Sequence, residues 1–161
     1  MIYDPLNIIL IEDNAEDESL ALRALRGSHL PLIVRVARDG EHALRVLGLS
    51  DGAPSEAKIP DLVISDLKLP KLMGDEILLR ARREERLKNV PYVLFSSSDD
   101  RQDINRCLRL GASGYETKPI DFGDYIDCVR GIVHRWLGQK PRAVAPNPRT
   151  KSTPAGLLRT A

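Results

Sequence analysis

The sequence predicts an α/β protein in which helices cover both faces of a parallel β-sheet. Four short apolar segments, of the kind that forms strands buried on both faces, and a fifth, more polar segment at 113–117 are each followed by a segment with helical periodicity. This alternation is typical of a parallel sheet. The chain has 161 residues, of which 42% are hydrophobic and 29% charged, a composition that fits one ordinary globular domain.

The first strand is predicted over residues 6–11, an uninterrupted apolar run that stops at the acidic pair Glu12-Asp13. A helix is predicted over about residues 15–27, because an apolar stripe recurs at helical spacing and Gly27 is a suitable stop. The first strand–helix unit is therefore defined at both ends.

The second and third strands are predicted over residues 32–37 and 62–64, both short apolar or β-branched runs. Asp39 is a suitable N-cap for the helix between them, which reaches about residue 47. Residues 48–58 are rich in Gly, Ser, Pro and Ala, which predicts an exposed loop before the third strand.

The remaining units follow the same pattern. The third helix is predicted over residues 74–88, the fourth strand over 92–95 and the fifth strand over 113–117. Between these strands lies a fourth helix that ends near Gly111.

The last helix is predicted over residues 121–137 from a single apolar stripe. The stripe consists of Phe122, Ile126, Val129, Val133 and Trp136. Tyr125 and Ile132 lie beside this stripe, where they could contact a symmetric partner. We therefore expect a homodimer.

The net charge of +1 is unevenly distributed. Residues 139–161 contain five basic and no acidic residues, which leaves 19 basic and 23 acidic residues in 1–138, a net charge of −4. We expect a folded domain at 1–138 and a basic, Pro-rich, disordered tail at 139–161. The tail is too short and too rich in proline for a helix-turn-helix, so no nucleic-acid partner is expected.

The two cysteines, Cys107 and Cys128, lack the spacing of a disulfide framework or a zinc site. No apolar run reaches membrane-spanning length, and the first residues do not resemble a signal peptide. These features predict a cytoplasmic protein without a membrane partner.

Four of the five predicted strands end in polar residues that could share one pocket. These polar residues are Glu12-Asp13, Asp66, Ser96 and Lys118. Since the carboxyl ends of parallel strands lie along one edge of the sheet, we expect these side chains to converge there.

Three of these groups, Glu12, Asp13 and Asp66, are carboxylates that would resist ionisation together unless a cation offset their charge. Oxygen ligands without His or Cys favour a hard ion, and Mg²⁺ fits. We expect Asp13, Asp66 and the main-chain carbonyl of Lys68 to be direct ligands, with Glu12 acting through water.

The same pocket suits phosphoryl transfer, which requires an in-line nucleophile and compensation of charge on the phosphoryl oxygens. Asp66 would be the phosphorylated nucleophile. Mg²⁺ would neutralise one oxygen, Lys118 a second, and the Ser96 hydroxyl would donate to a third. Because Ser96 begins a run of three serines, Ser97 or Ser98 could be the relevant hydroxyl.

These segments resemble the receiver domain of two-component response regulators. The matching pieces are Ile9-Leu10-Ile11-Glu12-Asp13-Asn14, Ile64-Ser65-Asp66-Leu67-Lys68-Leu69-Pro70, Ser96 and Tyr115-Glu116-Thr117-Lys118-Pro119, within residues 6–137. The resemblance implies a flavodoxin-like (βα)5 fold with strand order 2-1-3-4-5 and a histidine-kinase phosphodonor. It also implies a cis peptide bond before Pro119. Ser96 and Tyr115 would couple phosphorylation to the face made by the fourth helix, the fifth strand and the fifth helix.

The loop at 48–60 and the expected lack of an effector domain are similar to stand-alone, single-domain receivers paired with phytochrome histidine kinases. The cognate kinase and the downstream target are not encoded in any motif.

Two other functions compete with this interpretation. An aspartyl phosphatase usually carries a second Asp two residues after its nucleophile, but that position is Lys68 here. We therefore expect a phosphoacceptor with at most slow self-dephosphorylation, and not an enzyme. A receiver-like module that binds partners without phosphorylation would have no need of three crowded carboxylates.

Overall fold

The structure, a computed structural model, describes residues 4–52 and 57–139. Its elements in chain order are β1 (Leu6–Ile11), α1 (Ala15–Arg26), β2 (Leu32–Ala37), α2 (Gly40–Leu47), β3 (Leu62–Ser65), α3 (Gly74–Arg83), β4 (Tyr92–Ser96), α4 (Arg101–Arg109), β5 (Gly114–Thr117) and α5 (Phe122–Leu137). The predicted tail lies outside the described residues, apart from residue 139. None of the helices described is long and apolar enough to cross a membrane.

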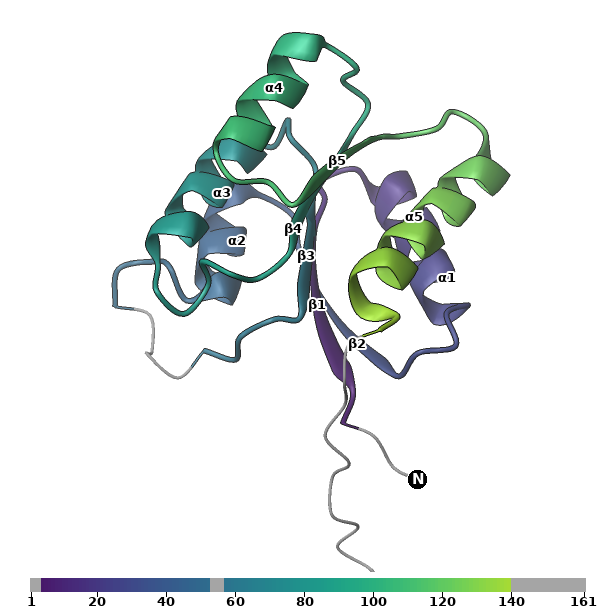
Figure 1. Ribbon diagram of the computed structural model, residues 1–161, viewed down its shortest axis with the longest axis horizontal. Coiled ribbons are helices and arrows are strands. Elements are labelled where there is room, and N and C mark those ends of the chain that lie inside the picture. The colour runs from purple at the N-terminus through teal and green to yellow at the C-terminus, as the bar shows by residue number, and fades with distance from the viewer. Residues whose placement is uncertain (1–3, 53–56, 140–161) are drawn as a thin grey trace, which may run out of the picture.

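The five strands form one parallel sheet in the order β2-β1-β3-β4-β5. Helices α2, α3 and α4 cover one face, and α1 and α5 cover the other (Figure 1). The predicted flavodoxin-like fold with strand order 2-1-3-4-5 is therefore confirmed.

Each face of the sheet has its own hydrophobic core. Alternate residues of β1 point to opposite sides, so Ile9 and Ile11 pack toward α2 and α3, while Ile8 and Leu10 pack toward α1 and α5. The central strands β1, β3 and β4 are buried along their whole length. This double burial explains why their sequences are apolar without alternation.

Side-chain caps start several helices close to where the sequence predicts. Asn14, Asp39 and Asp121 each accept a hydrogen bond from a backbone N–H in the first turn of α1, α2 and α5, respectively. These caps define where the chain turns away from a strand end, and so where the strand-end side chains can meet.

The third helix is shorter than predicted, because α3 ends at Arg83 and not near residue 88. Glu84 has extended backbone angles, and the following turn is held by the half-buried side chain of Arg82. The Arg82 guanidinium donates to the carbonyls of Leu87, Val90 and Gly111. These contacts, one of them with Gly111 of the α4–β5 turn, hold the chain in a turn after Arg83 where the local pattern indicates further helix.

The predicted core stripe of α5 is wrong in part. The buried residues are Tyr125, Val129, Ile132, Val133 and Leu137. The Tyr125 ring packs edge-on against Phe95 at 4.9 Å between centroids, and α5 packs against α1, whereas Phe122 is 69% exposed. Tyr125 and Ile132 therefore lie in the core and are not free to form the dimer contact predicted for them.

Candidate functional site

The candidate site is centred on the ammonium group of Lys118, which lies directly after β5. Its Nζ is 2.6 Å from Glu12 Oε1, 2.8 Å from Asp66 Oδ2 and 2.8 Å from Asp17 Oδ2. The Lys118 side chain is only 7% exposed. The structure thus brings Lys118 and Asp66 together at the carboxyl edge of the sheet, as the topology predicted.

Backbone hydrogen bonds extend the sheet by one residue at this edge and hold the side chains in register. The Asp66 N–H donates to the carbonyl of Ile11 at 2.9 Å, and the Glu12 N–H donates to that of Ala37 at 2.9 Å. On the other side, the Lys118 N–H donates to the carbonyl of Ser96 at 2.7 Å. The pocket is therefore built on the rigid ends of the strands.

Glu12, Asp13 and Asp66 form the predicted carboxylate cluster. One carboxylate oxygen from each residue lies within 4.8 Å of the others. Glu12 is buried, Asp66 is half-buried and Asp13 is exposed, so the cluster opens to solvent on the Asp13 side. Lys68, two residues after Asp66, is exposed in the loop after β3, and its carbonyl remains a predicted ligand.

The charges in this pocket do not balance. Burial raises the pKa of Glu12 to about 7, although its contact with Lys118 opposes this shift. Burial by itself would lower the pKa of Lys118, but hydrogen bonds to Asp17, Asp66 and Glu12 outweigh it and leave that pKa above its usual value. The pocket thus holds one cation among several carboxylates, and the all-oxygen donor set fits a hard divalent ion such as Mg²⁺.

The carboxylate of Asp66 is held at both oxygens. Its Oδ1 accepts a hydrogen bond from the backbone N–H of Leu67 at 2.7 Å, while Oδ2 accepts from Lys118. Glu12 is held similarly, because its second oxygen accepts from the backbone N–H of Asn14 at 3.2 Å. Both carboxylates are oriented before any ligand enters.

The three serines after β4 have different surroundings. Ser96 is 1% exposed at the end of the strand, whereas Ser97 is exposed. The Ser98 hydroxyl donates to Asp103 Oδ2 at 2.6 Å, near the start of α4. Ser96 is thus the only one of the three that is buried at the strand end, in the position that the sequence predicts.

Tyr115 lies on β5 and reaches the same loop. Its hydroxyl donates to the carbonyl of Ser98 at 2.7 Å. Burial raises the pKa of Tyr115, so the phenol is neutral and acts as a donor. Tyr115 therefore links β5 to the β4–α4 loop, which begins directly after Ser96.

Asp17 is a residue that the sequence analysis did not place in the pocket. It lies in the first turn of α1, where an acidic residue is ordinarily explained by the helix dipole. The available signal was its spacing, since it follows Asp13 by four residues, about one helical turn. That spacing alone does not predict contact with a lysine 101 residues away.

The predicted cis peptide bond before Pro119 is wrong for this structure, because no cis peptide bond occurs among the described residues. The trans form of a bond before proline is favoured by about 0.5–1 kcal/mol. With a trans bond, the Lys118 N–H still bonds to Ser96 and its Nζ still reaches the carboxylates. These contacts therefore do not need the cis form.

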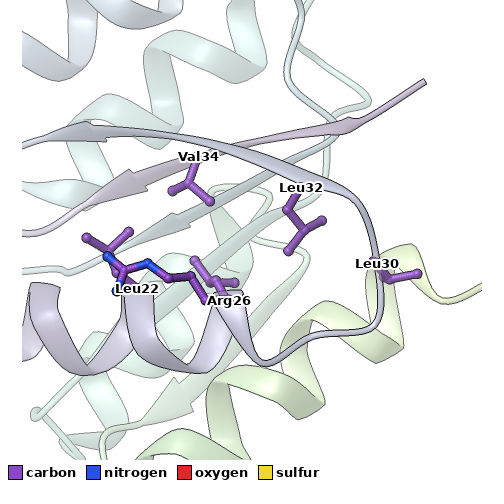
Figure 2. Close-up of a pocket in the computed structure, with 6 residues that line it drawn as sticks. Leu22, Arg26, Leu30, Leu32 and Val34 are labelled. Carbon is purple, nitrogen blue, oxygen red and sulfur yellow. The ribbon is translucent and has the colours of Figure 1, made fainter. Parts of the chain in front are cut away.

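A groove between α1 and β2 is an alternative cavity, with a volume of about 410 Å³. Figure 2 shows its lining, which consists of Leu22, Leu25, Arg26, Leu30, Leu32 and Val34. Among the described residues that line the groove, Arg26 is the only charged one, and none of them carries a carboxylate or a nucleophile. The groove therefore lacks the groups that group transfer requires, whereas the Lys118 pocket contains carboxylates and an ammonium group.

Comparisons with known proteins agree with this geometry. The family model described as the response regulator receiver domain matches residues 8–130. The probable methanogenesis regulatory protein FilR2 of Methanothrix harundinacea is 35% identical over 135 residues, which cover 84% of this chain and 86% of FilR2.

Two solved structures are similar in both sequence and fold. The phosphorylated cyanobacterial phytochrome response regulator RcpA has a TM-score of 0.79 and 33% identity, covering 86% of this chain and 99% of RcpA. The Mn²⁺-bound form of the response regulator Rcp1 of Synechocystis has a TM-score of 0.78 and 29% identity, covering 86% of this chain and 99% of Rcp1.

Proposed function

Because this chain belongs to the response regulator receiver family, we propose that it accepts a phosphoryl group on Asp66 from a sensor histidine kinase in the presence of Mg²⁺. The observation that carries the proposal is the pocket itself. A lysine ammonium lies 2.8 Å from the Asp66 carboxylate, beside a cluster of three carboxylates suited to a divalent ion.

In the proposed reaction, an oxygen of the Asp66 carboxylate attacks the phosphorus of a phosphohistidine. An O–P bond forms, the N–P bond breaks, and the histidine nitrogen keeps the electron pair and takes up a proton. Lys118 offsets charge on one phosphoryl oxygen, and the Ser96 hydroxyl donates to another. Asp13, Asp66 and the Lys68 carbonyl would hold a Mg²⁺ ion directly and Glu12 would hold it through water, and the ion would supply the remaining charge compensation.

Phosphorylation would act as an electrostatic switch. The phosphoryl group adds a charge of about −1.5 to −2 and strong acceptor oxygens beside the Ser96 hydroxyl. If Ser96 turns toward it, the β4–α4 loop moves and Tyr115 loses the geometry of its bond to Ser98. The population then shifts toward a second arrangement of the face formed by α4, β5 and α5.

The test is incubation of the full chain with Mg²⁺ and acetyl phosphate, followed by intact mass. The wild type should gain one phosphoryl group and Asp66→Asn should gain none. Asp127→Asn, which changes an exposed carboxylate on α5, should behave as the wild type does. An unmodified wild type would favour the partner-binding module. Steady phosphate release from a phosphomonoester would favour the phosphatase.

We propose a phytochrome-type histidine kinase as the partner, since RcpA is a phytochrome response regulator by its description. The chain would then work in the cytoplasm as a phosphoacceptor, with at most slow self-dephosphorylation. Phosphotransfer profiling against the histidine kinases of the source organism tests the pairing. Preferential transfer from a kinase without a phytochrome photosensory region would refute it.

Homodimerisation stays a separate proposal. Tyr125 and Ile132 no longer support it, because both side chains are buried in the core and cannot contact a partner. The exposed apolar side chains near the start of α5, Ile120 and Phe122, are alternative contacts. Light scattering at tens of micromolar, with and without phosphorylation, should give a dimer mass, and a monomer under both conditions would exclude it.

A further inference from the structure

Lys118 forms ion pairs with three carboxylates, but only two of them belong to the carboxylate cluster of Glu12, Asp13 and Asp66. Glu12 and Asp66 are members of the cluster, whereas Asp17 is not. In the metal-free arrangement the ammonium therefore bonds to two of the three carboxylates that a divalent ion would use. An entering ion would therefore compete with Lys118 for Asp66 directly and for Glu12 through water.

Asp17 is held in place independently of the cluster. Its backbone N–H donates to the side chain of Asn14, the N-cap of α1, at 3.0 Å. Its carbonyl accepts a hydrogen bond from the hydroxyl of Tyr125, a core residue of α5, at 3.2 Å. Both bonds hold the backbone of Asp17 without involving the cluster, and from this position its carboxylate reaches Lys118 Nζ at 2.8 Å.

We propose that Asp17 is a positioning residue that retains the Lys118 ammonium when Mg²⁺ enters the cluster. This proposal rests on the proposed function, because it concerns the loading of the same pocket. Two cations cannot share the oxygens of Glu12 and Asp66 without strong repulsion. Asp17 gives the ammonium an anionic partner outside the cluster, so the metal can bind without displacing Lys118 into solvent.

The consequence is a coupling between three groups. Asp17 lowers the free-energy cost of placing Mg²⁺ beside Lys118 and keeps the ammonium within reach of a phosphoryl oxygen on Asp66. Without Asp17, the only carboxylate partners left to Lys118 in the described pocket are Glu12 and Asp66, the residues that the metal requires.

A simpler role would be a general electrostatic effect of an acidic residue in the first turn of α1. Glu16 separates the two possibilities, since it is exposed in the same turn and makes no ion pair with Lys118 in the described structure. Glu16→Gln removes the same charge at nearly the same place along the helix axis, and so it is a matched control for Asp17→Asn.

The experiment is calorimetric titration of the full chain with Mg²⁺ at about pH 8, where Glu12 is mostly ionised. Asp17→Asn should raise the Kd for Mg²⁺ about tenfold, as expected for loss of a short charge pair, and Glu16→Gln less than about threefold. In a Lys118→Met background, the effect of Asp17→Asn should fall to that of Glu16→Gln. Asp17→Glu, which keeps the charge, should restore part of the affinity.

An Asp17→Asn effect no larger than that of Glu16→Gln, or one that persists without Lys118, would overturn the inference. Failure of the wild type to bind Mg²⁺ or to gain a phosphoryl group would instead refute the proposed function. Urea unfolding of each variant identifies any loss of folded protein, and Asp17→Ser provides a second uncharged variant for the same comparison.

Discussion

Replacing Lys118 with Met should destabilise the metal-free protein in a pH-dependent way. The substitution keeps much of the side-chain volume but removes the only cation bonded to Glu12 and Asp66 in the described structure. The Lys118, Glu12 and Asp66 side chains are 7%, 3% and 12% exposed, so solvent screens these contacts weakly. Removing one partner of such a buried pair costs about 3–5 kcal/mol.

The pH dependence follows from Glu12. Its pKa is about 7 in the folded protein, against 4.5 for the unperturbed group, so wild-type stability decreases as pH rises from about 4.5 to 7 and then levels off. Without Lys118 the folded-state pKa of Glu12 rises further, because the contact that lowered it is gone. The variant therefore continues to lose stability above pH 7, where the unfolded chain holds no proton on Glu12.

We expect the variant to lose about 4 kcal/mol of unfolding free energy near pH 8, within the range for a broken buried pair. Near pH 6 the loss should be smaller by about 1.4 kcal/mol, the value of one pKa unit. Urea unfolding followed by circular dichroism, with a chelator present, measures both values. Lys88→Met, which removes a surface pair with Glu85, should cost less than about 1 kcal/mol at either pH.

A loss that is equal at the two pH values would refute the assignment of the pH dependence to Glu12. No loss at either pH would refute the structural role of the Lys118 ion pairs. Added Mg²⁺ should restore part of the stability of the variant, because ion binding to the folded state replaces the missing positive charge.

Two further predictions concern the carboxylate cluster and Gly74, the first residue of α3. Burial places the pKa of Glu12 at about 7, and its ionised form favours a bound cation. Mg²⁺ affinity should therefore fall as pH drops below 7, and Mg²⁺ binding should release protons. Calorimetric binding heats near pH 7 that do not depend on the ionisation enthalpy of the buffer would contradict this prediction. Gly74→Ala should destabilise the protein by about 2 kcal/mol or more and weaken Mg²⁺ binding, because its Cβ would overlap the carbonyl oxygen of Asp66. Gly131→Ala, which adds a Cβ in open space on α5, should instead be neutral or stabilising in the same urea assay.

Much of the pocket could be predicted from the sequence because parallel strands end at one edge. The apolar runs before Glu12, Asp66 and Ser96 indicate three strands, a fifth strand is expected before Lys118, and the strand–helix alternation makes these strands parallel. Convergence of these four residues then follows from topology, without knowledge of any side-chain contact.

The orientation of α5 could not be predicted with the same certainty. More than half of the residues of this helix are apolar, so they form two overlapping stripes with helical spacing, one containing Phe122 and the other Tyr125. The spacing alone does not say which stripe faces the core. Contact of Tyr125 with Phe95 and packing of α5 on α1 select the second stripe. Tyr125 and Ile132 were expected to contact a partner because they lie outside the Phe122 stripe. They belong to the buried stripe instead, so that expected contact is wrong.

By itself, the sequence determined the order of strands and helices, the burial of the central strands and the kinds of group at each strand end. These features depend on local periodicity and on which residues follow each apolar run. Only the tertiary structure decided how α5 is rotated, where α3 ends, and that Asp17 shares the ammonium of Lys118. Each of these depends on contacts between segments far apart in the chain, which form only when the helices pack on the sheet.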